Sequence, residues 1–338
     1  MTGPGARDGG IGRGGGGGWR PDGAGEGESA GVRVGVDIGG TFTDVVAVRE
    51  AADGPVTRSL KVPSTPDDPA RAVLEGVEEV LRRLGSGPGR PLPDVVHGST
   101  VATNALLERK GPRTAFVATR GFGDLLAIAR QTRPDLYDLF SDRPDPLVPP
   151  ALCFEVDERV DRRGEVLERP SDEELAALAR ELASRDLESV ALCFLFSFLR
   201  PGHERRAAAA LEEAGLDVSA SSEVLPEFRE YERASTTAVD AFVTPVLDRY
   251  LGRLEASLPA RRFRVMQSGG GSVGVETARR RGVGSILSGP AAGVVGASAV
   301  ARQAGLEDVV TLDMGGTSTD VSLVRGGPAV TREAEVGV

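Results

Sequence analysis

One polar phrase occurs twice in the sequence, and its residue types suit the binding of phosphate and a metal ion. Residues 34–48 read VGVDIGGTFTDVVAV and residues 310–324 read VTLDMGGTSTDVSLV, with nine of fifteen positions identical. Two unrelated segments of average composition would share roughly one position. Each copy places Asp-x-Gly-Gly-Thr-x-Thr-Asp between two apolar segments, which is typical of a tight hairpin. Two hairpins of one design are therefore expected, facing one ligand from two lobes.

Three features of the phrase favour a phosphorylated ligand. Paired glycines let backbone N–H groups approach an anion and tolerate the positive φ of an anion-binding nest, and threonine hydroxyls add donors. Asp37 and Asp313 end apolar strands, where an unpaired carboxylate is costly. Hydrated Mg²⁺ suits them, because it is held by one or two carboxylates together with phosphate oxygens. ATP is the natural ligand for such a set.

The predicted site residues follow from this arrangement. Asp37 and Asp313 are the expected Mg²⁺ ligands. The catalytic candidates are Asp37, Asp313 and Asp320, and which aspartate acts as a base stays open. The expected phosphate-binding residues are Gly39, Gly40, Thr41, Thr43, Asp44, Gly315, Gly316, Thr317 and Thr319.

Other glycine-rich phosphate loops do not fit. A Walker loop has Gly-Lys-Ser/Thr opening a helix, and a dinucleotide fingerprint has Gly-x-Gly-x-x-Gly opening a helix. Here an apolar strand follows, and neither copy contains a lysine. A single copy would be better explained as a plain glycine hairpin than as a ligand site. The duplication, with both aspartates present, favours ligand binding.

The two copies resemble the first and second phosphate motifs of the actin, sugar-kinase and heat-shock-chaperone ATPase superfamily. Six other segments resemble the hydantoinase A and 5-oxoprolinase family, in collinear order over about residues 32–338. They are HGSTVATNALLERKG (97–111), IARQTRPDLYDLF (128–140), EVDERVDRRGEV (155–166), EYERASTTAVDAFVTPVLDRYL (230–251), RVMQSGGG (264–271) and SGPAAGVVGA (288–297).

This resemblance implies a fold and an activity. The implied fold is α/β, a two-lobed actin-like (ribonuclease-H-like) ATPase with the second lobe truncated. The implied activity is ATP-dependent opening of a cyclic amide, of the hydantoin, N-methylhydantoin or 5-oxoproline type, through phosphoryl activation of the substrate carbonyl. A hydantoinase B-type subunit is the implied partner. Two alternatives stay open: the ketone-activating subunit of an acetone-type carboxylase, and a non-catalytic truncated ATP-binding module.

Two groups of residues are substrate candidates. The first group lies at the start of a predicted helix and consists of His97, Thr100, Thr103 and Asn104. A helix N-terminus favours anionic or carbonyl oxygens, although a capping loop explains the same residues. The second group, Arg130 and Arg133, could hold a substrate carboxylate or orient an acidic partner surface, or form a solvated charge pair.

The chain is predicted to have three parts. Residues 1–30, with thirteen glycines, form a disordered tail; residues 31–261 form the N-terminal lobe with the first motif; residues 262–338 form an incomplete second lobe. The alternation of elements predicts an α/β sheet with helices outside. Strands are expected at 32–38, 43–49, 55–61, 114–119, 152–160, 189–195, 216–220 and 263–267. Helices are expected at 68–84, 100–109, 171–185, 202–214, 228–257 (broken near Pro245), 275–281 and 290–304.

Composition excludes several functional classes. A net charge of −10 argues against nucleic acid as the main partner. Two cysteines and two histidines make a zinc or disulfide framework improbable. The longest apolar run, residues 190–199, is shorter than a membrane helix of ~20 residues, and the N-terminus lacks a secretory core. We expect a cytoplasmic protein with no membrane partner.

Overall fold

The computed structural model describes residues 31–65, 67–86, 91–132, 137, 145–314 and 319–331. It confirms a mixed α/β chain with parallel strands. The predicted glycine-rich tail, residues 1–30, lies outside the described residues. In the described part, none of the helices combines the length and the apolar run that crossing a membrane requires.

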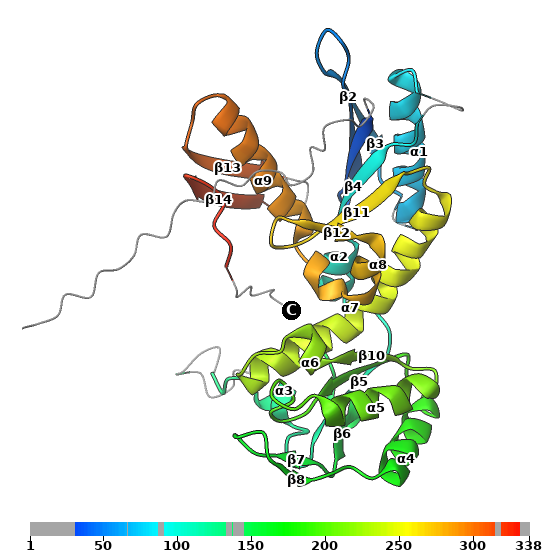
Figure 1. The fold of residues 1–338 in the computed structure, drawn as a ribbon, viewed down its shortest axis with the longest axis vertical. Helices are drawn as coiled ribbons and strands as arrows, with labels where there is room; N and C mark the ends of the chain where they lie inside the picture. The colour runs from blue at the N-terminus through cyan, green and yellow to red at the C-terminus, as the bar shows by residue number, and fades with distance from the viewer. Residues whose placement is uncertain are drawn as a thin grey trace, which may run out of the picture. The chain divides into compact units, whose positions relative to one another are not determined.

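The first sheet carries the first copy of the repeated phrase. Its strand order is β12-β11-β4-β1-β2-β3 (Figure 1). Three strands are antiparallel to one another: β1 (Val32–Ile38), β2 (Phe42–Arg49) and β3 (Val56–Pro63). On the other side of β1 lie β4 (Asp94–Ser99) and then β11 (Arg262–Met266), which pair in parallel. The edge strand β12 (Ser272–Gly274) pairs antiparallel with β11. The repeated phrase thus begins on a strand that has neighbours on both sides.

Helix α1 (Pro69–Arg83) packs against the core face of this sheet. β1 alternates buried and exposed residues, as a strand with one face in the core does. The buried Val73 and Val77 of α1 lie in the same hydrophobic cluster as the buried valines of β1. A Cβ built on Gly76 would lie 2.8 Å from Val45 Cγ2, so glycine at this position allows α1 to approach β2.

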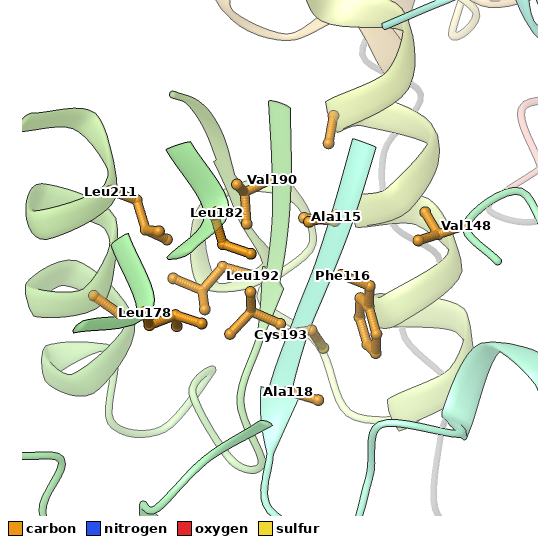
Figure 2. Close-up of a cluster of buried hydrophobic side chains, with 14 of the residues drawn as sticks. Ala115, Phe116, Ala118, Val148, Leu178, Leu182, Val190, Leu192, Cys193 and Leu211 are labelled. Carbon is orange, nitrogen blue, oxygen red and sulfur yellow. The ribbon is translucent and has the colours of Figure 1, made fainter. Parts of the chain in front are cut away.

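The second sheet is fully parallel, in the order β10-β9-β5-β6. It consists of β5 (Thr114–Thr119), β6 (Cys153–Val156), β9 (Ser189–Cys193) and β10 (Asp217–Ala220). Every residue of β5 and β9 is buried, which is typical of a parallel sheet covered on both faces. Figure 2 shows Leu178 and Leu182 of α4 (Asp172–Ala183) and Leu211 of α5 (Gly202–Glu213) on one side of β5 and β9, with Phe116 on the other.

Helix α7 (Glu230–Ser257) contributes to both hydrophobic cores. Ala234 and Ala238 belong to the core of the second sheet, whereas Leu247 and Leu254 belong to the core of the first. The predicted break near Pro245 was wrong, because α7 is one helix of 28 residues with the buried Pro245 inside it. A proline removes one helical hydrogen bond, but burial of both halves in packed cores keeps them in one helix.

The second copy of the phrase forms its own two-stranded sheet, β13 (Asp308–Met314) with β14 (Thr319–Arg325). Helix α9 (Ser288–Gln303) packs against it. The remaining elements are α2 (Val101–Leu107), α3 (Leu125–Ile128), β7 (Arg159–Val160), β8 (Val166–Glu168), α6 (Ser221–Val224), α8 (Val275–Arg280) and the 3₁₀ turns η1 (Pro150–Leu152) and η2 (Gly282–Ser285).

Two further predictions about elements need correction. Strand 263–267 was expected to begin the second lobe, but β11 pairs in parallel with β4 inside the first sheet. β4 itself was not predicted, because its apolar run is only DVV, residues 94–96, before a histidine and a glycine. Both corrections concern the centre of the first sheet. The division into an N-terminal lobe and an incomplete second lobe stays a prediction in other respects.

Candidate phosphate-binding site

The two copies of the phrase fold into hairpins with the same register, which confirms the predicted hairpins. In the first, Asp37 lies opposite Asp44 and Ile38 lies opposite Thr43. In the second, Asp313 pairs with Asp320, and Met314 pairs with Thr319. The chain therefore builds the same arrangement of aspartates twice.

The first bend is tight and lacks the predicted left-handed nest. Gly39 N donates to Phe42 O at 3.0 Å. A Cβ on Gly39 would lie 3.2 Å from that oxygen, so close approach explains this glycine. Neither Gly39 nor Gly40 has a positive φ, and the predicted nest conformation was wrong here. Gly40 is exposed, with open space where a Cβ would be.

Backbone donors remain at this bend. No described residue accepts a hydrogen bond from the N–H of Gly40 or of Thr41. Thr41 is exposed, so its hydroxyl is accessible as a further donor. An oxyanion placed over the bend would find these three groups on consecutive residues.

Ser64, which the sequence did not single out, braces the bend from the end of β3. Its Oγ donates to Gly39 O at 2.7 Å, and its N donates to Thr41 O at 2.9 Å. The Ser64 Oγ also lies 3.1 Å from Thr43 Oγ1. Thr43 is fully buried, so its hydroxyl holds the hairpin together and the predicted direct phosphate contact is corrected to a supporting one.

Asp37 lies in a crowded, negatively charged environment. Desolvation raises the pKa of its carboxyl first, and the charges of Asp44 and Asp313 raise it further, while Lys61 lowers it. The residue keeps an exposed surface, but protein atoms approach its carboxylate closely. A Cβ on Gly98 would lie 3.1 Å from Asp37 Oδ1, and one on Gly289, in the first turn of α9, would lie 3.5 Å from it.

The charge of one predicted metal ligand, Asp313, acts on the other, because it contributes to the raised pKa of Asp37. Carboxylate oxygens are the donors that Mg²⁺ prefers, and one or two are enough when phosphate and water complete the shell. No group of three or more His, Cys, Asp or Glu side chains that could hold a metal occurs among the described residues. Asp37 and Asp313 supply the type of donor that suits a Mg²⁺ bound together with a phosphate, and the described residues offer no cage made of protein ligands alone.

The second bend is only partly described. Gly315, Gly316 and Thr317 lie outside the described residues, and Thr319 is exposed at the start of β14. Asp313 and Asp320 are among the residues that line a hollow of about 540 Å³ between α9 and the β13–β14 hairpin. Its lining also includes Gly293 and Ala297 of α9 and apolar residues of β13 such as Leu312.

The substrate candidates near His97 have structural contacts. His97 is fully buried in β4, with its Nε2 2.8 Å from Tyr250 Oη. Burial lowers the pKa of its imidazole to about 4, so the ring is neutral near pH 7. This packing removes His97 from direct contact with a substrate, and the expectation of a substrate pocket at His97 is corrected.

Three neighbours of His97 connect the first bend to α9. Thr100 Oγ1 donates to Ile38 O at 3.0 Å, next to the bend. Thr103 Oγ1 accepts from the N–H of Leu287, the residue before α9, at 3.0 Å. Asn104 is exposed, with its Nδ2 3.5 Å from Thr100 Oγ1. These contacts position the surroundings of Asp37.

The arginine pair is separate from these contacts. Arg130 Nε donates to Glu232 Oε1 at 2.9 Å, and its guanidinium group lies 6.0 Å from the centre of the Tyr231 ring. Both partners belong to the first turn of α7. Arg133 lies outside the described residues, so a paired carboxylate clamp stays a prediction.

Comparison with known proteins adds a family to this geometry. Residues 33–215 match the family model described as the hydantoinase/oxoprolinase N-terminal region, and residues 233–338 match the model described as hydantoinase/oxoprolinase. The caprolactamase subunit alpha of Pseudomonas jessenii is 35% identical over 87% of this chain and 44% of its own length. The 5-oxoprolinase of Saccharomyces cerevisiae is 35% identical over 86% of this chain and 26% of its own length.

Solved structures agree with the sequence matches. A nucleotide-free acetone carboxylase, described as acting by ATP-dependent acetone carboxylation, matches with a TM-score of 0.78 at 26% identity, over 88% of this chain and 44% of its own. The ATP-dependent caprolactamase of Pseudomonas jessenii matches with a TM-score of 0.75 at 35% identity, over 86% and 43%. The chain thus spans less than half the length of these relatives.

Proposed function

This chain belongs to the hydantoinase/oxoprolinase family, and we propose that it supplies the ATP-using part of a hydrolase that opens a cyclic amide. The observation that carries the proposal is the pair of hairpins with one register, whose aspartates Asp37 and Asp313 share one electrostatic environment. Relatives described as ATP-dependent support the choice of nucleotide. We further propose that the hairpins belong to the two lobes of an actin-like ATPase fold.

The residues of the first bend would bind and orient the triphosphate. The N–H groups of Gly40 and Thr41 and the Thr41 hydroxyl would donate to phosphate oxygens. Asp37 and Asp313 would hold Mg²⁺, which when bound neutralises phosphate charge. Ser64 and Thr43 would keep the bend in place, so that the donors need no rearrangement when charge develops.

The proposed chemistry activates an amide that water attacks slowly. The carbonyl oxygen of the substrate attacks the γ-phosphorus, an O–P bond forms, and the bond to the bridging oxygen of ADP breaks. Water then adds to the activated carbon, and the ring C–N bond breaks as the ring nitrogen takes up a proton. A second water hydrolyses the acyl phosphate that remains, which releases inorganic phosphate and leaves a carboxylate. Phosphoryl transfer depends mainly on in-line positioning and charge neutralisation, which are the two tasks assigned to the hairpins. We propose a hydantoinase B-type subunit as the partner that completes ring opening.

A second candidate is ketone activation before carboxylation, which the acetone carboxylase match favours. In that reaction the nucleotide would phosphorylate the enol oxygen of a ketone. The same hairpins would serve, because both reactions transfer the γ-phosphoryl group to an oxygen of a carbonyl compound.

ADP release by the full chain tests the proposal. It is measured with Mg-ATP and, in turn, hydantoin, 5-oxoproline, caprolactam, or acetone with bicarbonate, with and without a B-type subunit. We expect one cyclic amide to stimulate ADP release and Asp313→Asn to abolish the stimulation. Stimulation by acetone and bicarbonate alone would favour the second candidate. If calorimetry detects no Mg-ATP binding, both candidates are wrong.

A further inference from the structure

Lys61 lies beside the aspartates of the first hairpin. It is on β3, directly opposite Asp44 in the β2–β3 register, and its Nζ is 2.9 Å from Asp44 Oδ2. The same Nζ lies 5.3 Å from the centre of the Phe42 ring. Its charge also acts on Asp37, where it opposes the effects of Asp44 and Asp313. The positive charge of Lys61 is therefore part of the candidate site.

The pair with Asp44 does not by itself account for a lysine here. The side chains of Lys61 and Asp44 are 58% and 49% exposed, and ion pairs this exposed contribute little to stability. Of the 40 basic residues, only Lys61 and Lys110 are lysines and the rest are arginines. Arginine would pair with a carboxylate at least as well, because its planar fork matches two oxygens.

A lysine ammonium offers what a terminal phosphate needs. It is a compact charge with three N–H donors, and Asp44 occupies one of them. The partner carboxylate limits where the flexible side chain can point, and the exposed position leaves the other donors open to a ligand over the bend. We propose that Lys61 Nζ, oriented by Asp44, donates to the γ-phosphate of bound ATP and makes the site prefer ATP to ADP.

This inference rests on the proposed nucleotide site and adds a residue that contacts the transferred group. A fixed ammonium group at the γ-phosphate would offset the charge on its oxygens during transfer. ADP lacks this phosphate, so the contact would be made in the ATP complex alone. The change in affinity for Mg-ATP relative to that for Mg-ADP therefore separates this role from a structural one.

The test compares the affinities of Mg-ATP and Mg-ADP by calorimetry on the full chain. Lys61→Gln removes the charge, Lys61→Arg keeps it with a different shape, and Lys110→Gln is the matched control because Lys110 forms a similar exposed pair with Glu108. We expect Lys61→Gln to weaken Mg-ATP roughly 10- to 100-fold, the range of a charged hydrogen bond, with little change for Mg-ADP. Lys61→Arg should fall between this variant and the original chain, and Lys110→Gln should have no effect.

Each outcome distinguishes this inference from the function on which it depends. If the original chain binds ATP and Lys61→Gln keeps the same ATP-to-ADP ratio, the role of Lys61 is wrong and the nucleotide site stands. Equal weakening of both nucleotides, with a lowered melting temperature, also overturns it, because it indicates a structural role. If the original chain binds neither nucleotide, the proposed function fails and this inference fails with it.

Discussion

Replacing Ser64 with alanine tests whether β3 holds the first bend in a binding conformation. The hydroxyl donates to Gly39 O at 2.7 Å and lies 3.1 Å from the fully buried Thr43 Oγ1. One such bond contributes about 0.5–1.5 kcal/mol, and a buried polar group left without a partner costs about 1–3 kcal/mol. We expect Ser64→Ala to lower the free energy of unfolding by about 2 kcal/mol. Mg-ATP affinity should fall about tenfold, because the donors of the bend are less well oriented. This fall corresponds to about 1.4 kcal/mol of binding free energy.

Urea unfolding followed by circular dichroism measures the first effect, and calorimetry measures the second. Ser184→Ala is the matched control, since Ser184 Oγ donates to Glu181 O at 2.7 Å on an exposed surface. We expect this control to lose less than about 1 kcal/mol. Equal losses in both variants, with unchanged nucleotide affinity, would refute the bracing role.

Three further predictions concern stability. Asp37→Asn should raise the melting temperature at pH 7 in the absence of Mg²⁺. Because the pKa of Asp37 is raised in the folded protein, its contribution to stability is complete below the ordinary value of 3.8 and is lost as the pH rises. If the melting temperatures of the variant and the original chain do not diverge between pH 3 and pH 8, this prediction is contradicted. Tyr250→Phe should cost about 1–3 kcal/mol in urea unfolding, because buried His97 loses its partner, and should leave nucleotide affinity unchanged. Gly76→Ala should cost about 1–3 kcal/mol by overpacking α1 against β2, whereas Gly202→Ala, with open space around it, should not destabilise.

The sequence predicted the hairpins because their information is local. Alternating apolar residues and paired glycines lie within each fifteen-residue phrase, so the pairing of Asp37 with Asp44 follows from one short segment. The second sheet was also predictable, since continuous apolar runs such as residues 114–119 are typical of strands buried on both faces.

The surroundings of Asp37 could not be predicted in the same way. Gly98 and Gly289 approach its carboxylate from β4 and α9, which are far apart in the chain. Ser64 reaches the bend because β3 pairs with β2, and nothing in its own sequence neighbourhood indicates this. The expectation of a positive φ at Gly39 and Gly40 was wrong for a related reason. The carbonyl of Phe42 lies so close to Gly39 that this position requires glycine. The sequence of the phrase alone does not distinguish this cause from a left-handed conformation.

The negative charge gathered around Asp37 links the stability of this protein to its proposed activity. The negative charges of Asp44 and Asp313 both act on Asp37, and Lys61 opposes them. A fold selected for stability alone would not gather these carboxylates at the end of a strand, because each ionised neighbour disfavours the next. A bound divalent cation reverses the sign of this interaction. The prediction that Asp37→Asn is the more stable protein and the proposal that Asp37 helps to hold Mg²⁺ are therefore two consequences of one arrangement of charge.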